Sequence, residues 1–286
     1  MKPLNRVAIV GVGLIGGSIG LAVRRAGLAR EIVGVGRRET SLAIAKQRGA
    51  VDRVTTELAD GVRQAELVIV CTPVDLVAGH VALAAAACQP ETLITDAGST
   101  KVQIVRDVEE AAQRENWPAG VRYLGSHPLA GDHNSGPEAA RGDLFDERLV
   151  VVTPTAQTPD VDLHRLRRFW LALGASVVTM SADEHDRAIA ATSHVPHLVA
   201  AVLAASTLKS DLALAASGWK DTTRVAAGDP QLWRQIVLAN RDNVLAALGT
   251  VERNIAELRA ALEHEDGDKL ESLLREAKQN RDAVGS

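Results

Sequence analysis

Short apolar runs alternate with amphipathic stretches through the first 180 residues of the chain. The runs at 6–10, 31–35, 66–71, 92–95, 121–125, 148–153 and 175–180 have the length and composition of buried strands. Helices are predicted between them, over 14–26, 40–49, 75–88, 100–115 and 160–173. This alternation is typical of a mostly parallel, doubly wound α/β sheet, in which each helix crosses from one strand to the next.

The pattern changes after residue 181, where runs of strand length stop. The ranges 183–208, 230–262 and 266–283 are rich in Ala and Leu and carry charges at helical spacing. Asp229-Pro230 is a typical helix start. We therefore expect an α/β domain over 1–180 and an all-helical domain over 181–286. The small apolar side chains of the second domain favour close helix packing and a homodimer interface.

Composition narrows the class of protein. The 286 residues suffice for about two domains, and 46% of them are apolar but only 2% aromatic, so aliphatic side chains fill the core. The net charge of −4 favours neither a nucleic-acid nor a membrane-surface partner. No run approaches the roughly 18 consecutive apolar residues of a membrane span. Two cysteines without a disulfide or metal-binding spacing, and no signal peptide before the first strand, predict a cytoplasmic location.

The segment RVAIVGVGLIGGSIG, at 6–20, carries the strongest motif in the chain. Gly11-x-Gly13-x-x-Gly16 directly follows a predicted strand and opens a predicted helix, the context in which this spacing binds a dinucleotide. Gly11 permits the tight turn, Gly13 lets the backbone approach a pyrophosphate, and Gly16 lets helix pack on strand. Unpaired N–H groups at the helix start then face the phosphates. We therefore expect a Rossmann-type domain; a glycine-rich turn without a ligand is the alternative.

The end of the second predicted strand indicates which dinucleotide binds. NAD-binding domains of this type carry an acidic residue there, which accepts hydrogen bonds from the ribose, but here Gly36 has that position. Arg37 and Arg38 follow and can pair with a 2′-phosphate, and Ser41 can add a hydroxyl donor. We therefore expect NADP in preference to NAD, with NAD binding still open; two solvated arginines are the alternative. The other predicted cofactor contacts are Leu14, Ile15, Thr72 and Pro73.

Four further segments carry side chains suited to catalysis: DAGSTK at 96–101, GSHPLAG at 125–131, SHVPH at 193–197 and DTTRVA at 221–226. With the glycine motif, and in this order and approximate spacing, they make the chain similar to the prephenate and arogenate dehydrogenases of tyrosine biosynthesis over essentially its whole length. The resemblance implies a dinucleotide-binding domain followed by a helical dimerisation domain. It also implies oxidative decarboxylation of a cyclohexadienol to tyrosine or 4-hydroxyphenylpyruvate.

His127 is the predicted general base of that reaction. As hydride leaves the carbinol carbon, a base must take the hydroxyl proton, and the pKa of imidazole lies near working pH. We expect His127 in a loop after a strand, on the cofactor side. Ser99 follows another predicted strand, and the resemblance supports a hydroxyl that orients His127 or touches the substrate. Ser99 can also cap the helix predicted over 100–115.

Arg224 is the predicted ligand of a substrate carboxylate, because a guanidinium binds carboxylates with two hydrogen bonds and the resemblance puts it at the family's substrate-binding arginine. An ion pair with Asp221 is the alternative. We expect His197 to line the substrate pocket and His194 to be a pocket or packing residue. Two histidines three residues apart lack an acidic or cysteine partner, so we expect no metal.

One pair of residues departs from the family's pattern. After HPLAG the family usually has a small hydroxyl residue and then often an acidic one, whereas this chain has Asp132 and His133. A carboxylate there can pair with the ammonium of arogenate and disfavour prephenate, unless His133 neutralises it. We therefore expect arogenate to be accepted, with prephenate or both left open. Alternatives are a β-hydroxyacid or imine-type dehydrogenase, or a non-catalytic NADP-sensing protein.

Overall fold

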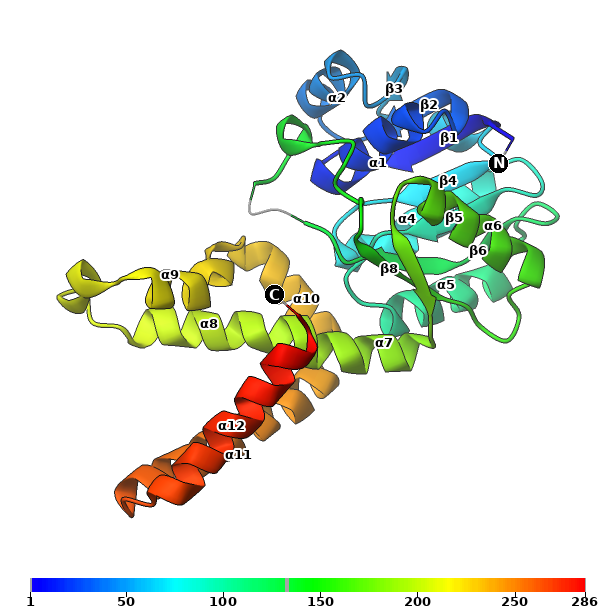
Figure 1. The fold of residues 1–286 in the computed structure, drawn as a ribbon. Coiled ribbons are helices and arrows are strands. Elements are labelled where there is room, and N and C mark those ends of the chain that lie inside the picture. Colours follow the sequence, from blue (N-terminus) through cyan, green and yellow to red (C-terminus); the bar gives the residue numbers. More distant parts are fainter. Residues whose placement is uncertain (1, 132–133, 286) are drawn as a thin grey trace.

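A parallel sheet forms the centre of the first domain in the computed structural model, which describes residues 2–131 and 134–285 (Figure 1). Its strand order is β3-β2-β1-β4-β5-β6, so the chain leaves β1 in one direction and resumes on its other side at β4. Ligands of such sheets bind at the carboxyl ends of the strands beside this reversal. The strands are β1 (Leu4–Val10), β2 (Ala29–Val35), β3 (Arg53–Thr55), β4 (Leu67–Val70), β5 (Leu93–Asp96) and β6 (Arg122–Tyr123).

Helices cover both faces of this sheet, which explains its nearly uninterrupted apolar strands. Along β1, Val7 and Ile9 enter one core while Ala8 and Val10 enter the other, as the two-residue period of a strand requires. The predicted doubly wound class is confirmed. The connections contain α1 (Leu14–Arg25), α2 (Glu39–Gln47), α3 (Leu58–Val62), the 3₁₀ helix η1 (Val74–Leu76), α4 (Val77–Ala87) and α5 (Val102–Arg114).

A second, three-stranded sheet was not predicted. It contains β7 (Gly125–Pro128), β8 (Leu149–Thr153) and β9 (Ser176–Thr179), with η2 (Pro137–Ala139) and α6 (Asp160–Ala172) in its connections. β7 is antiparallel to β8, and β8 is parallel to β9. The run predicted as one strand over 121–125 therefore forms parts of two strands. Its first part is β6, which pairs with β5 in the first sheet, and Gly125 begins β7 in the second. Gly125 packs so tightly that a Cβ there would lie 2.5 Å from Oγ1 of Thr153.

The second domain is helical throughout its described residues. Ser181 begins it with a capping box, in which its hydroxyl accepts from the backbone N–H of Glu184. The predicted helix over 183–208 contains a π-helical turn, and the one over 230–262 divides at Asn240. The elements are α7 (Ala182–Ile189), the π turn η3 (Ala190–His194), α8 (Val195–Ser206), η4 (Asp211–Leu214), α9 (Ser217–Thr223), η5 (Arg224–Ala227), α10 (Pro230–Ala239), α11 (Arg241–Glu263) and α12 (Gly267–Ala283).

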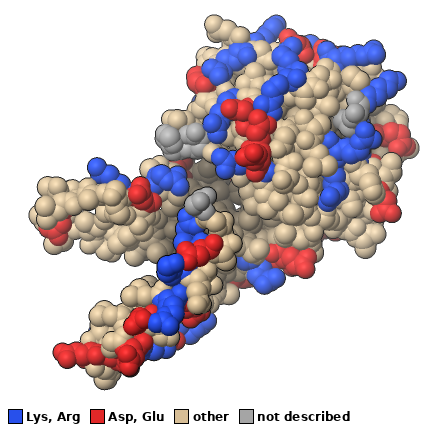
Figure 2. All heavy atoms as spheres, in the orientation of Figure 1, with Lys and Arg blue, Asp and Glu red and all other residues tan. Residues whose placement is uncertain are grey.

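Two arms of this domain, α8 with α9 and α11 with α12, project away from the sheet (Figure 1). Figure 2 shows a largely uncharged surface along the first arm. Large apolar side chains are exposed there, including Val202, Leu208 and Leu214, the last at 85%. The segment Ala182–Ser206 is long and apolar enough to cross a membrane by length and composition alone, but it also carries buried His185 and Asp186 within the packed domain.

Candidate active site

A groove of about 1000 Å³ lies at the carboxyl ends of β1, β2 and β4. It gathers most of the predicted cofactor contacts from three separate stretches of the chain. Leu14 and Ile15 do not line it; their side chains are partly buried against the core beneath. The predicted residues that do line it are Gly11, Gly13, Arg37, Arg38, Ser41, Thr72 and Pro73.

The three glycines of the motif have different surroundings. Gly11 has a φ of +96°, and a Cβ there would lie 2.7 Å from the carbonyl oxygen of Cys71. A Cβ at Gly16 would overlap the carbonyl oxygen of Gly11, so this glycine seats α1 on β1. A Cβ at Gly13 would meet no described atom within 4 Å. α1 begins there without a side-chain cap or an acidic residue in its first turn, which leaves N–H groups for an anion.

The end of the groove beside β2 is positively charged. None of the described residues that line it is acidic, and Arg37 and Arg38 have no ion pair within the described ranges. Burial lowers the pKa of His80, and the charge of Arg37 lowers it further. His80 also lies 3.0 Å from the hydroxyl of Thr72, through its Nδ1. Within the described residues, the two guanidinium groups and the start of α1 therefore offer hydrogen-bond donors and positive charge to an anion.

His127 belongs to strand β7 rather than to the predicted loop, and only 9% of it is exposed. Its Nδ1 lies 2.9 Å from Nε2 of His185, whose Nδ1 lies 2.7 Å from Oδ1 of Asp186. The carboxylate of Asp186 also accepts hydrogen bonds from the backbone N–H groups of Lys101 and Val102, at 2.7 and 2.9 Å. Sequence reasoning missed His185 and Asp186; an adjacent His-Asp pair eight residues before SHVPH was the available signal.

The environment of His127 keeps its imidazole neutral. Burial lowers its pKa well below the usual value, and the neighbouring His185, Lys101 and His194 lower it further. A neutral imidazole is the form that a general base needs. Its other ring nitrogen, Nε2, has no hydrogen bond to any residue that the structure describes.

A second buried network joins the end of β5 to the start of β7. Asp96 forms an ion pair with Lys101, whose side chain is fully buried. Asp96 also accepts from the hydroxyl of Tyr123, at 2.8 Å, and from the backbone N–H of Ser126, at 3.2 Å. Val70 pairs with Asp96 across the sheet, and Cys71, the next residue, lines the cofactor groove. His127 is thus held at the same edge of the sheet as the groove.

Ser99 lies between these networks, just after β5. The alternative role as a helix cap is wrong, because α5 begins at Val102 and the carboxylate of Asp186 binds the N–H groups at its start. Ser99 has no hydrogen bond to His127 in the part of the chain that the structure covers. Its orienting role stays a prediction.

His194 and His197 lie against Trp233, which α10 supplies. The ring of His197 stacks on the indole at 3.5 Å, and His194 meets it edge-on. Asn240 donates through Nδ2 to the carbonyl oxygen of Asp186, at 2.7 Å, and the same nitrogen lies 3.2 Å from Nδ1 of His194. Burial lowers the pKa of His194 to about 4. His194 Nε2 and His197 Nδ1 are buried without partners in the described chain.

Arg224 begins the 3₁₀ helix η5 and is exposed. It forms no ion pair with Asp221 or any other described residue, so its guanidinium is free to bind a carboxylate. The structure gives no hydrogen bond that joins Arg224 to His127 or His197. Asp132 and His133, the predicted specificity residues, lie outside the described residues.

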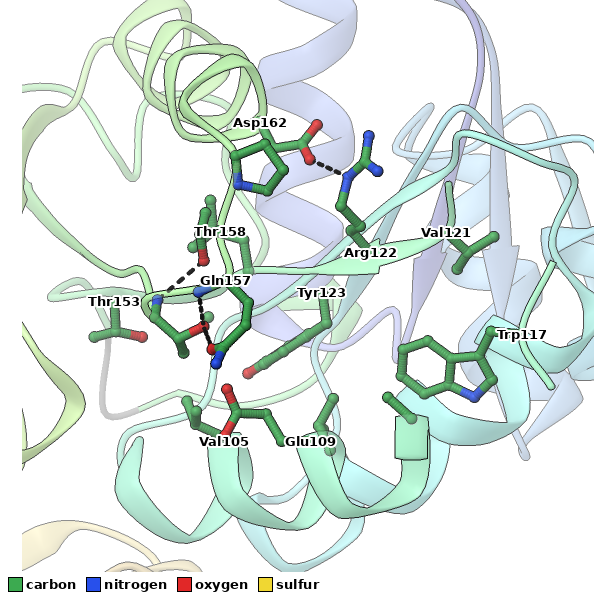
Figure 3. Close-up of a pocket in the computed structure, with 16 residues that line it drawn as sticks. Val105, Glu109, Trp117, Val121, Arg122, Tyr123, Thr153, Gln157, Thr158 and Asp162 are labelled. Carbon is green, nitrogen blue, oxygen red and sulfur yellow. Dashed lines mark hydrogen bonds and ion pairs between the residues drawn. The ribbon is translucent and has the colours of Figure 1, made fainter. Parts of the chain in front are cut away.

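A separate cavity of about 680 Å³ lies beyond β6 (Figure 3). Val105, Trp117 and Val121 give it an apolar wall, and an ion pair between Arg122 and Asp162 lies at its edge. None of the predicted site residues lines it. Tyr123, one of its lining residues, is linked to the networks above because its hydroxyl donates to Asp96.

A dinucleotide groove beside a buried neutral histidine, followed by a helical domain, defines a dinucleotide-dependent oxidoreductase. Residues 19–179 match the model of the prephenate dehydrogenase nucleotide-binding domain, and residues 181–276 match that of the prephenate dehydrogenase dimerization domain. The chain belongs to the prephenate dehydrogenase family, which confirms the resemblance drawn from its motifs.

Individual relatives agree over nearly the full chain. A cyclohexadienyl dehydrogenase from Zymomonas mobilis is 32% identical, over 99% of this chain and 97% of that protein. The prephenate dehydrogenase of Aquifex aeolicus, solved with hydroxyphenyl propionate and NAD+, is 31% identical with a TM-score of 0.88, over 98% of each chain. The Synechocystis arogenate dehydrogenase is 28% identical with a TM-score of 0.82, over 98% of this chain and 99% of that one.

Proposed function

We propose that this protein is an arogenate or prephenate dehydrogenase that prefers NADP. It would oxidise and decarboxylate a cyclohexadienol to tyrosine or 4-hydroxyphenylpyruvate. The observation that carries the proposal is His127: a buried, neutral imidazole at the same edge of the sheet as the groove, with one ring nitrogen that no described residue binds.

We assign each part of the reaction to one group. Nε2 of His127, which no described residue binds, takes the proton of the ring hydroxyl, and the guanidinium of Arg224, which has no ion pair in the described chain, binds a carboxylate. The unpartnered nitrogens of His194 and His197 give polar contacts to the ring substituents. Bound in the groove, the cofactor would supply the hydride acceptor. Loss of carbon dioxide then leaves an aromatic ring.

NADP preference follows from the charge of the groove. Gly36 stands where a carboxylate would repel a 2′-phosphate, and Arg37 and Arg38 are free of competing ion pairs in the described structure. Ser41 adds a hydroxyl at the same end. These residues support a selective contact with the extra phosphate.

Substrate choice rests on Asp132 and His133. We propose that the carboxylate of Asp132 pairs with the ammonium of arogenate, which favours that substrate over prephenate. An Asp132→Asn variant is then expected to lose arogenate turnover more than prephenate turnover. Equal losses with both substrates would contradict this assignment.

The helical domain is proposed to form a homodimer. The exposed apolar side chains of α8 and the segment after it, among them Val202, Leu208 and Leu214, form a surface of the kind that a second copy covers. Light scattering is expected to give twice the chain mass.

We also propose a cytoplasmic location for the protein. Its two cysteines, Cys71 and Cys88, are free thiols, as is usual in a reducing compartment.

Steady-state turnover tests the whole proposal. Arogenate and prephenate are each assayed with NADP and with NAD, and reduced cofactor and carbon dioxide are measured together. The expected result is one carbon dioxide per reduced cofactor, with a higher kcat/KM for NADP. A protein that binds NADP but turns over neither compound would instead be a sensor, or a dehydrogenase of another class.

A further inference from the structure

The hydrogen-bond donors around Asp186 determine the proton positions on both neighbouring histidines. An ionised carboxylate only accepts, so Nδ1 of His185, 2.7 Å from Asp186, carries a hydrogen. In a neutral ring the other nitrogen, Nε2, is then an acceptor. His127 Nδ1, 2.9 Å away, must donate to it. The remaining nitrogen of His127, Nε2, is therefore the bare one.

This arrangement is held rigidly from several elements. Asp186 receives the N–H groups of Lys101 and Val102 at the start of α5, and its own carbonyl accepts from Asn240. His185 is fully buried and Asp186 is 1% exposed. Neither ring can turn without breaking a buried hydrogen bond, which is costly.

The surroundings of His127 disfavour a positive charge on its imidazole. The groups that face it are Lys101, from the start of α5, the neutral His194, from the π turn, and the His185–Asp186 pair, from α7. The charge of Lys101 is paired with Asp96 of β5. A cation on His127 would lie buried beside another cation, whereas a cation on His185 would lie directly against a carboxylate.

We propose that His185 and Asp186 form a proton relay behind His127. As the substrate O–H bond breaks, its proton bonds to Nε2 of His127, and the Nδ1 proton of His127 passes to Nε2 of His185. The hydroxyl electron pair becomes the carbonyl bond as hydride leaves to the dinucleotide. The positive charge then lies beside Asp186. After the product departs, the proton on Nε2 of His185 returns to Nδ1 of His127, and Nε2 of His127 releases the substrate's proton to water. This inference rests on the proposed function.

Two variants separate the parts of the relay. In Asp186→Asn, the amide can donate to Nδ1 of His185, which reverses the tautomer of both rings. By analogy with the same change in serine protease triads, kcat falls roughly 10³–10⁴-fold. In His185→Gln, the amide oxygen still accepts from Nδ1 of His127 but cannot take a proton, so the loss is smaller, about 10²-fold. Glu184→Gln, an exposed neighbour whose side-chain oxygen accepts from the backbone N–H of Ser181 as a glutamine oxygen also can, is the matched control.

A pH profile distinguishes a relay from a structural support. In His185→Gln the proton can rest only on the buried His127, whose surroundings disfavour the charged form, so the acid limb of kcat/KM moves to lower pH than in the wild type. NADP affinity stays within about twofold in a folded variant. Full activity in both variants, or an unmoved limb in His185→Gln, would overturn the relay.

Nitrogen NMR of the histidine side chains tests the relay without turnover. The free wild-type protein is expected to show Nδ1–H tautomers for both His127 and His185, and Asp186→Asn is expected to show Nε2–H tautomers. An Nε2–H tautomer on His127 in the wild type would overturn the relay even if prephenate or arogenate is turned over. Expected tautomers in a protein that turns over neither compound would count against the proposed function alone.

Discussion

The cofactor groove and the histidine network are built in opposite ways. The groove depends on missing side chains: Gly11 lets the backbone turn at positive φ, Gly16 lets α1 pack on β1, and the space beside Gly13 holds no described atom. The network depends on buried side chains from β5, β7 and α7 and on Asn240 between α10 and α11, which hydrogen bonds link to one another or to nearby backbone groups. A site built from backbone groups tolerates substitutions away from its few contact positions. A buried polar network is sensitive to substitution of any of its residues, because each lost partner leaves another buried group without its hydrogen bond.

The largest expected effect tests whether the two regions are independent. His127→Ala should lower kcat by roughly 10³–10⁴-fold, at the upper end of general-base effects, because it removes the proposed proton acceptor. NADP affinity should change little, since His127 does not line the groove. Steady-state kinetics and a direct binding titration measure the two effects separately. His264→Ala, an exposed histidine on the far arm, is the control. A parallel loss of NADP binding would show that the regions are coupled.

Charge in the groove gives the next largest effect. Replacing both Arg37 and Arg38 by Ala should lower the ratio of kcat/KM for NADP to that for NAD about 100-fold, because each charged hydrogen bond contributes about 1.5–3 kcal/mol and part of it is shared. Arg30, at the other end of β2, is the matched control and should leave the ratio unchanged. An unchanged ratio in the double variant would show that the arginines are only solvated.

The glycines should separate binding from stability. Gly16→Ala forces a Cβ into the carbonyl oxygen of Gly11, so the free energy of unfolding should fall by about 1–3 kcal/mol. Gly13→Ala meets no described protein atom within 4 Å and should leave stability unchanged while weakening NADP binding about tenfold. Denaturant unfolding and binding titrations on the same two proteins check this. Equal stability losses would contradict the assignment of Gly13 to the ligand.

Acid should lower the free energy of unfolding, because His194 is held neutral in the folded state. Folding lowers the pKa of His194 to about 4, so below the ordinary value of 6.5 the unfolded state binds more protons than the folded state. The free energy of unfolding therefore falls as pH decreases from about 6.5 toward about 4. Urea unfolding at several pH values measures this slope, which His194→Asn should reduce. A slope unchanged by that substitution would place the acid sensitivity elsewhere.

The same contrast explains what could be predicted from the sequence. The groove was predictable because its glycines, strand and helix lie within 6–20, and because Arg37 and Thr72 follow strands whose parallel arrangement brings their ends together. The histidine network could not be predicted from the sequence, because it depends on where α7 packs. The sequence does not reveal that Asp186 binds the start of α5, or that Lys101 turns inward to Asp96. The placement of His127 was wrong because the break between β6 and β7 depends on tertiary pairing with β8.

The most direct test of the account is a crystal structure with NADP+ and tyrosine bound. We expect the phenol oxygen within hydrogen-bond distance of Nε2 of His127, with Nδ1 still directed at His185. We also expect the 2′-phosphate on Arg37 and Arg38. A phenol bound away from His127, with that imidazole turned from the ligand, would contradict its role as the proton acceptor.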